Sequence, residues 1–383
     1  MIPLFPKHTG ADTTIFSVMS ALAQQYNAIN LSQGFPDYPI EEDLGNLLYE
    51  ASRKGFNQYA PMAGLPILQE AIATHTARST GITFGSPNIT ITPGASYGIY
   101  TALATILQAG EEVIILEPAY DSYIPAIEMN GGIPVPVALN SPTFTINWAL
   151  LEESITLKTK AIIVNTPHNP TGMVWQQSDW DRLTKLIAER NIYVLSDEVY
   201  EQVIFDGLPH CSVLSQPALQ DRCFAIYSFG KAFHNTGWKV GYVVANEALT
   251  KAFRRVHQFL AFSVNTPAQY AIATYMQQFP LNNSGILLAQ KRNLFNELMG
   301  DLPFTLPQVA KGSYFQVADY SAISPLPDTE FAAWLTKEVG VATIPISAFY
   351  KNGSDAKLIR FCFAKKEETL RAAIERMKAH LIG

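Results

Sequence analysis

Between residues 88 and 245 the chain alternates short apolar runs with windows of helical spacing, and this alternation limits the possible folds more than any other feature. Near-continuous apolar runs rich in β-branched residues are typical of parallel strands that are covered on both faces. Strands that alternate with helices indicate an α/β fold. The chain therefore predicts a seven-stranded, mostly parallel sheet from residues 88–92, 112–116, 133–139, 160–165, 192–197, 223–228 and 239–245.

A second, smaller α/β unit is expected in the last third of the chain. With 383 residues, 48% of them hydrophobic, the chain can bury one large core and still form a smaller domain. Helical windows dominate residues 247–299, which we expect to form a long connection. We expect an N-terminal arm and part of the small domain in residues 1–40, the large domain in 41–280 and the small C-terminal domain in 281–383.

The composition argues against several classes of partner. The formal net charge of −6 comes from 27 basic and 33 acidic residues without a long run of either sign, which does not favour nucleic acid or an anionic membrane. The three cysteines form no CxxC pair, the first residues lack a secretory signal, and no apolar run is long enough to span a bilayer. We therefore expect a cytoplasmic protein that binds no nucleic acid, membrane or metal.

A lysine follows one of the predicted buried strands. Lys231 comes three residues after the run 223–228, at the mouth of that strand. Burial disfavours the ammonium form of lysine and lowers its pKa, which leaves part of the amine nucleophilic near neutral pH. Lys231 is therefore a candidate Schiff-base lysine. A surface lysine whose stem packs on Phe229 or Phe233 would explain the same window.

The first predicted strand of the sheet leads into a turn and a helix. Gly94, Ala95 and Ser96 open that helix, whose free N–H groups are suited to a phosphate. The stretch 94–98 also matches the GxSxG pattern of a hydrolase nucleophile elbow. A hydrolase would leave the polar groups at the other strand ends unexplained. Its nominal histidine partners are His210, His234, His257 and His380.

Other strand ends carry an aromatic ring, an amide and a carboxylate. Tyr120 is suited to stacking on a ligand ring, and Asn169 and Tyr200 are suited to donating to a phenolate oxygen. Asp197 needs a cationic partner if it is buried, and a pyridinium nitrogen is one. The plainer alternatives are aromatic packing for Tyr120 and a structural Asn-Pro turn for Asn169.

Two further cations complete the set. Lys239, shortly after Lys231, is suited to a phosphate. Arg360, in a predicted strand of the small unit, carries a planar fork that matches a carboxylate, although a surface arginine on an edge strand is the alternative. Together these groups match pyridoxal 5′-phosphate (PLP) and an amino-acid substrate.

The chain resembles, over nearly its whole length, the class I aminotransferases of the fold-type I PLP-dependent enzymes. The resemblance is carried by GASYG, EPAYDSY, NTPHNPTG, SDEVYE, SFGKAFHNTGWKVGY and IRFCFAKKE. Three further motifs, SQGFPDYP, NQYAPMAG and FSVNTPAQYA, are similar to those of the branch that holds kynurenine/glutamine and bacterial methionine aminotransferases. The bacterial methionine enzymes look most similar.

The resemblance implies a role for each matching position. Lys231 would bond covalently to PLP, and the pyridine ring would be bound by Asn169, Asp197, Tyr200 and Tyr120. The phosphate would be held by Ala95, Ser96, Ser228 and Lys239. The substrate would be bound by Arg360, Asn169, the backbone of Gly34 and, at its side chain, Phe16. The family is dimeric, and the positions implied to reach the partner subunit's site are Tyr59 and Ser263.

The implied activity is a ping-pong transamination from methionine, or another large neutral or aromatic amino acid, to a 2-oxo acid.

Two positions depart from common family patterns. Lys239 stands where many relatives have arginine, and Ser263 stands where kynurenine-type relatives tend to carry histidine, which argues against a kynurenine preference. Two rivals are another PLP reaction, such as β-elimination at a carbon–sulfur bond, and a non-catalytic binding or regulatory homologue.

Overall fold

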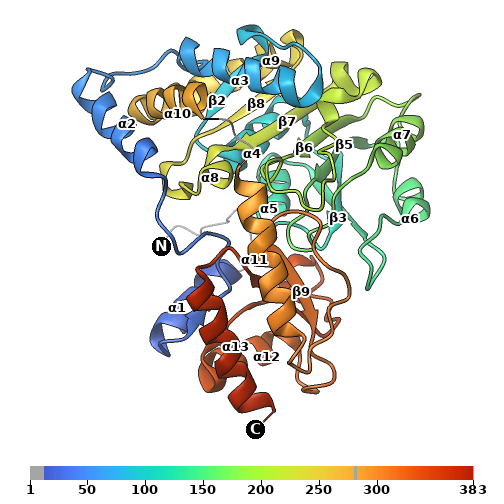
Figure 1. Ribbon diagram of the computed structural model, residues 1–383. Helices are drawn as coiled ribbons and strands as arrows, with labels where there is room; N and C mark the ends of the chain where they lie inside the picture. Colours follow the sequence, from blue (N-terminus) through green and yellow to red (C-terminus); the bar gives the residue numbers. More distant parts are fainter. Residues whose placement is uncertain (1–12, 280–282, 383) are drawn as a thin grey trace, which may run out of the picture.

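A seven-stranded sheet forms the centre of the computed structural model, which describes residues 13–279 and 283–382 (Figure 1). The strand order is β2-β8-β7-β6-β5-β3-β4. β8 runs antiparallel to both of its neighbours, and the other neighbouring strands are parallel. The predicted mostly parallel sheet is therefore confirmed. Its strands are β2 (Ile89–Thr92), β3 (Glu112–Glu117), β4 (Ile133–Ala138), β5 (Thr159–Asn165), β6 (Tyr193–Asp197), β7 (Cys223–Ser228) and β8 (Gly241–Ala245).

Both faces of this sheet are buried because successive strand residues point to opposite sides. On one face Ile115 and Ile163 pack in a core with α4 (Ala95–Ile106), α5 (Tyr123–Met129) and α9 (Glu247–Leu260). On the other face Ile114 and Ile162 belong to a larger core that continues into the small unit. This core includes residues of α2 (Glu42–Arg53), α3 (Pro66–Thr80), α7 (Gln177–Leu186) and α10 (Thr266–Gln278).

The small unit combines the C-terminal third of the chain with the first described helix. Its antiparallel sheet has the strand order β11-β12-β9. These strands are β11 (Ile344–Pro345), β12 (Leu358–Cys362) and β9 (Phe315–Asp319). A second pair joins β1 (Ile29–Asn30) to β10 (Val341–Ala342) in parallel. Around these strands lie α1 (Ile15–Gln25), α12 (Asp328–Trp334) and α13 (Glu367–Leu381). The predicted domain boundaries stay a prediction, and residues 1–12 of the expected arm lie outside the described residues.

Residues 247–299 differ from the long connection that we expected. α9 packs on α4, and α10 packs on α2 and α3, so both belong to the large unit. α11 (Asn283–Met299) is the helix that runs from the large unit into the small one (Figure 1). Across residues 13–279 and 283–382, none of the helices has the length and apolar character needed to cross a bilayer.

Candidate active site

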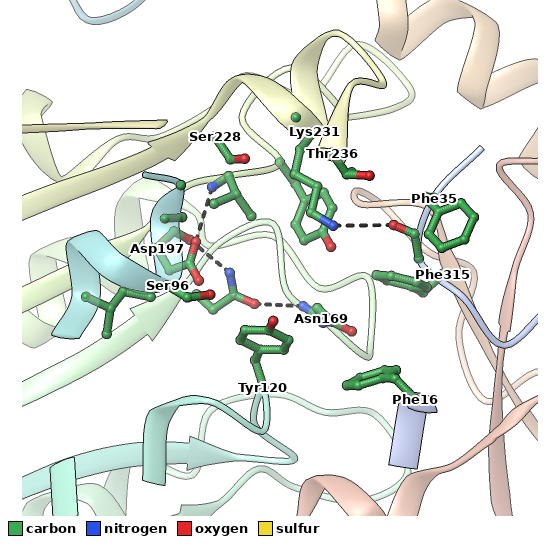
Figure 2. Close-up of a pocket in the computed structure, with 18 of the residues that line it drawn as sticks. Phe16, Phe35, Ser96, Tyr120, Asn169, Asp197, Ser228, Lys231, Thr236 and Phe315 are labelled. Atoms are coloured by element: carbon green, nitrogen blue, oxygen red, sulfur yellow. Dashed lines mark hydrogen bonds between the residues drawn. The ribbon is translucent and has the colours of Figure 1, made fainter. Parts of the chain in front are cut away.

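A cavity of about 310 Å³ opens beyond the carboxyl ends of β5, β6 and β7, where the large sheet faces the small unit (Figure 2). Ligands of open α/β sheets bind at this edge. Of the site residues predicted from the sequence, Tyr59 and Ser263 lie outside its lining and all others lie in it. Those in the lining are Phe16, Gly34, Ala95, Ser96, Tyr120, Asn169, Asp197, Tyr200, Ser228, Lys231, Lys239 and Arg360.

Lys231 projects into the cavity from α8 (Phe229–Ala232), the short helix that directly follows β7 (Figure 2). Its Nζ donates to the carbonyl oxygen of Gly34 at 3.3 Å and lies 5.6 Å from the ring centroid of Tyr200. Desolvation in the cavity lowers the pKa of the Lys231 amine to about 8. Part of this amine is therefore unprotonated, and nucleophilic, near neutral pH.

Asp197 ends β6 with its carboxylate buried beside the cavity. Oδ2 accepts a hydrogen bond from the Tyr123 hydroxyl at 2.6 Å, and Oδ1 accepts one from the backbone N–H of Val199 at 3.3 Å. Burial raises the pKa of this carboxyl to about 6, and the two hydrogen bonds limit the rise. A buried carboxylate of this kind is stabilised by a cationic ligand group, such as a protonated pyridine nitrogen.

Asn165, at the end of β5, connects two of the predicted ring-binding residues. Its Nδ2 donates to the backbone oxygen of Asp197 at 2.9 Å, and its Oδ1 accepts from the backbone N–H of Asn169 at 2.8 Å. Sequence reasoning missed Asn165 and Tyr123, although both lie within the recognised motifs NTPHNPTG and EPAYDSY. The only sequence clue to Asn165 was a polar residue that closes an apolar run.

Aromatic rings form one wall of the cavity. Tyr120 and Phe16 come from the large unit and from α1, and their ring centroids lie 6.4 Å apart (Figure 2). Tyr200 is buried, with its ring edge-on to that of Tyr314 at 5.1 Å. Burial raises the pKa of Tyr200 far above its ordinary value, so its hydroxyl remains a proton donor. Phe315, which the sequence analysis did not single out, also lines the cavity.

The N-terminus of α4 forms an anion cradle together with Lys239. Gly94 has φ 80°, and a side chain there would meet the Lys239 Nζ at 3.4 Å. Lys239 itself has φ 54°, an unfavourable conformation for a residue with a side chain. Ser96 and Ser228 line the same end of the cavity. Helix N–H groups, hydroxyls and an ammonium suit a phosphate group.

Arg360 lies in β12, the central strand of the small sheet, so the alternative of a surface arginine on an edge strand is wrong. Its Nη1 donates to Asn169 Oδ1 at 2.7 Å, and its Nη2 donates to the backbone oxygen of Ser32 at 2.7 Å. The guanidinium covers the Phe315 ring at 3.9 Å from the centroid. Burial lowers its pKa to about 10, so it stays charged at neutral pH and can hold a carboxylate.

The hydrolase alternative finds no support in this arrangement. No histidine occurs among the described residues that line the cavity around Ser96. His257 Nδ1 pairs with the Tyr97 hydroxyl at 2.9 Å, and His210 Nε2 pairs with Glu198 at 2.8 Å. A serine nucleophile needs a histidine base within hydrogen-bond reach, which these histidines do not provide.

The donor set fits PLP. The Lys231 amine suits its aldehyde, the Asp197 carboxylate suits its pyridinium nitrogen, and the α4 N-terminus with Lys239 suits its phosphate. Fold and site together therefore define a PLP-dependent enzyme of fold type I.

Comparison with known proteins places the chain more closely. The class I and II aminotransferase family model matches residues 26–377. The methionine aminotransferase of Escherichia coli strain K12 is 47% identical over 382 residues, which cover 98% of each protein. Kynurenine–oxoglutarate transaminase 1 of Rattus norvegicus is 33% identical, with 96% of each protein covered. A solved Escherichia coli structure, with an identified methionine aminotransferase function, has a TM-score of 0.95 and 46% identity and covers 98% of this chain and 100% of that one.

The chain belongs to the class I and II aminotransferase family. It is a PLP-dependent transaminase, and the resemblance drawn from its motifs is confirmed.

Tyr59 and Ser263 lie apart from the cavity of their own chain. The Tyr59 side chain is 83% exposed, and its ring stands edge-on to Phe262, next to Ser263, at 5.6 Å. Their predicted roles in the partner subunit's site stay a prediction.

Proposed function

We propose that the amino donor of this transaminase is methionine or another large neutral or aromatic amino acid, and that the acceptor is a 2-oxo acid in a ping-pong reaction. The single observation that carries the proposal is one cavity that holds both the Lys231 amine and the Arg360 guanidinium beside aromatic rings. The 47% identity with a methionine aminotransferase supports the choice of donor.

Six of the residues that line the cavity have a part in this proposal. Arg360, Asn169 and the Gly34 backbone bind the carboxylate of the amino acid and so orient its Cα. PLP, when bound, supplies an electron-withdrawing ring that stabilises the charge left when Cα loses its proton. Lys231, with a pKa near 8, accepts that proton and later returns it. Asp197 would pair with the pyridine nitrogen of bound PLP, and Tyr200 would donate to its phenolate oxygen.

The charges of the cavity favour a neutral substrate side chain. The cations among its described lining residues are Lys231, Lys239 and Arg360. In this proposal each of them would pair with the cofactor or with the substrate carboxylate. Phe16 and Phe35 offer apolar surface instead. A second carboxylate would be desolvated without a counter-ion, whereas a thioether or an aromatic ring would contact aromatic side chains favourably.

Incubation of the purified holoenzyme with methionine and a 2-oxo acid tests the reaction. Transamination yields 4-methylsulfanyl-2-oxobutanoate and a new amino acid, both measurable by mass spectrometry. Release of methanethiol, ammonia and 2-oxobutanoate would instead support elimination at the γ-carbon of methionine. β-Elimination is tested in the same assay with a donor that carries its sulfur on the β-carbon, such as S-methylcysteine. The visible spectrum of the protein, recorded with a panel of amino acids, ranks the donors and contradicts the non-catalytic alternative if it changes.

We also propose a cytoplasmic homodimer with shared active sites. Large apolar side chains are exposed together in one segment, with Phe259 84%, Leu260 52% and Phe262 49% accessible in the single chain. Tyr59 packs against this segment. A second copy of the chain would cover these rings and place Tyr59 and Ser263 at the partner's site. The free thiols of Cys211, Cys223 and Cys362 support a reducing compartment.

A further inference from the structure

The hydroxyl of Tyr123 is a buried group that the proposed reaction leaves without a role. Tyr123 is the first residue of α5, is 3% exposed, and approaches Asp197 from the segment that follows β3. Its hydroxyl donates to Asp197 Oδ2 at 2.6 Å, and its ring packs edge-on against Tyr120 at 5.8 Å. Burial raises the pKa of Tyr123 well above its ordinary value, so the hydroxyl keeps its proton and remains a donor.

The charge of Asp197 is set by opposing neighbours. Burial favours the neutral acid, and Glu198, next along the chain, adds repulsion. The Tyr123 hydroxyl, the Val199 N–H and the positive charge of Lys231 favour the anion. Of these three, Tyr123 makes the shortest hydrogen bond to the carboxylate. A charge-assisted bond of this length is among the stronger ones in proteins.

The consequence concerns a proton that a bound pyridine ring would share with Asp197. Such a proton resides mainly on the more basic of the two groups. A donor that stabilises the carboxylate makes Asp197 less basic and leaves the proton on the ring nitrogen. Without the donor the carboxylate becomes more basic, the ring loses positive charge, and its capacity to accept electrons falls.

We propose that Tyr123 is a positioning residue whose hydroxyl aims the Asp197 carboxylate and keeps the pyridine nitrogen of bound PLP protonated. The inference deepens the proposed function and rests on the same site. Its test is chosen so that it needs no substrate, and it therefore stands even if the proposed amino donor is wrong.

Cofactor binding to the apoenzyme provides the test. Tyr123→Phe removes one hydroxyl and keeps the ring that packs on Tyr120. We expect its affinity for PLP to fall about 10- to 100-fold, because a hydrogen bond to a charged group contributes about that factor. Its affinity for 1-deaza-PLP, in which a carbon replaces the ring nitrogen, should change by less than about twofold, since no proton is shared there.

The spectrum of the holoenzyme gives a second readout. We expect the pH at which the bound chromophore titrates to shift in Tyr123→Phe, and kcat to fall more than the KM for the amino acid rises. Tyr320→Phe is the matched control, because it removes another buried hydroxyl, bonded to the Leu326 oxygen at 2.8 Å in the small unit.

Two outcomes would overturn the inference. Equal loss of affinity for PLP and for 1-deaza-PLP would mean that Tyr123 only shapes the cavity. Unchanged PLP affinity and an unchanged chromophore titration would mean that the hydroxyl has no effect on the ring. A thermal melt of each apoenzyme separates either result from misfolding. If Tyr123→Phe does not fold, Val199→Pro provides a second test, because it deletes the other hydrogen-bond donor to Asp197. This variant should lose more affinity for PLP than for 1-deaza-PLP.

Discussion

The surroundings of Lys231 disfavour the protonated, positively charged form of its amine. Desolvation is the largest influence on its pKa, and the charges of Arg360 and Lys239 lower it further against the opposing effects of Cys362 and Asp197. The resulting pKa of about 8 lies well below the ordinary value of a lysine.

The reactivity of this amine in the apoenzyme is therefore predicted to rise with a midpoint near pH 8. Pulse labelling with an amine reagent between about pH 6 and 11, followed by peptide mass spectrometry, measures it. Exposed Lys251 on α9 serves as an internal control for the reagent. Lys231→Ala should abolish turnover, and borohydride reduction of the wild-type holoenzyme should leave the cofactor on the Lys231 peptide. Label on another lysine would contradict the assignment.

Arg360 is predicted to act on substrate binding rather than on cofactor binding. Arg360→Lys keeps a positive charge but loses the planar fork, and we expect KM for the amino acid to rise about 10- to 100-fold, because charge-assisted hydrogen bonds to a carboxylate are lost. PLP affinity should stay within about twofold. Arg371→Lys, on the exposed face of α13, is the control and should leave both quantities unchanged. A loss of PLP affinity with an unchanged KM would refute the clamp role.

At this scale several polar residues that end or follow strands could be predicted from the sequence, whereas Asn165 at the end of β5 and the supporting residue Tyr123 were missed. A polar residue at the end of an apolar run, or shortly after it, can be recognised from the sequence alone. This is the case for Asp197, Asn169 and Lys231. Tyr123 is different, because its hydroxyl meets a carboxylate 74 residues away. Only the packing of α5 on the sheet brings these two groups together.

Among the elements, the end of β6, the strand β7 and the segment 210–213 are joined by the buried acid Glu198. Glu198 accepts hydrogen bonds from His210 Nε2 at 2.8 Å, from the Tyr227 hydroxyl at 2.9 Å and from the Val213 N–H at 2.9 Å. Burial alone would raise the pKa of Glu198, but the charge of His210 and these donors lower it overall. Burial would lower the pKa of His210, but Glu198 raises it overall.

The stabilisation by this pair is predicted to depend on pH in a defined direction. The contribution of His210 is complete below its ordinary pKa, near 6.5, and is lost as the pH rises through its raised value. That of Glu198 is present above its ordinary pKa and is lost as the pH falls through its lowered value. His210→Gln should therefore reduce the free energy of unfolding by about 3 kcal/mol near pH 6 and by less near pH 9.

Urea unfolding of the holoenzyme at the two pH values measures this difference. His380→Gln, exposed on α13, is the control and should change neither value. A loss for His210→Gln that is equal at both pH values would mean that packing, not charge, explains it.

The strand β8 is predicted to need glycine at its first residue. A Cβ at Gly241 would lie 2.5 Å from the backbone carbonyl oxygen of Tyr227 and 3.0 Å from the carbonyl carbon of Gly94. Gly241→Ala should therefore push β8 away from the α4 N-terminus, cost about 1–3 kcal/mol of stability and weaken PLP binding. Gly237→Ala is the matched control, since a Cβ there meets nothing within 4 Å. Titration of both apoenzymes with PLP measures the effect. Equal PLP affinities of Gly241→Ala and Gly237→Ala would contradict the need for glycine at residue 241.

Element types were more predictable than element directions. The apolar runs located every strand of the large sheet, yet periodicity carries no information on direction, and β8 proved antiparallel. In the small unit, the apolar run 341–346 divides into β10 and β11 at Thr343, because β10 pairs with β1 and β11 pairs with β12. That division depends on partners from distant parts of the chain, which no local pattern reveals.

On the scale of the whole molecule, Tyr59 is the residue that most needs a second subunit to explain it. It lies outside the cavity of its own chain, and its side chain is 83% exposed. If Tyr59 binds the cofactor in the partner's site, each functional site combines Lys231 of one chain with Tyr59 of the other. Light scattering should then give twice the chain mass of 42.3 kDa.

A pair of heterodimers, purified through two different affinity tags, tests this sharing directly. In the crossed heterodimer one chain carries Lys231→Ala and the other carries Tyr59→Ala. One of its two sites keeps both wild-type groups, so we expect about half of the wild-type kcat per dimer. In the matched heterodimer a wild-type chain faces a chain with both substitutions, and each site lacks one group, so little activity should remain. The two proteins hold the same substitutions in the same number, and only their distribution differs. The reverse result, an active matched and an inactive crossed heterodimer, would show that Tyr59 serves its own chain.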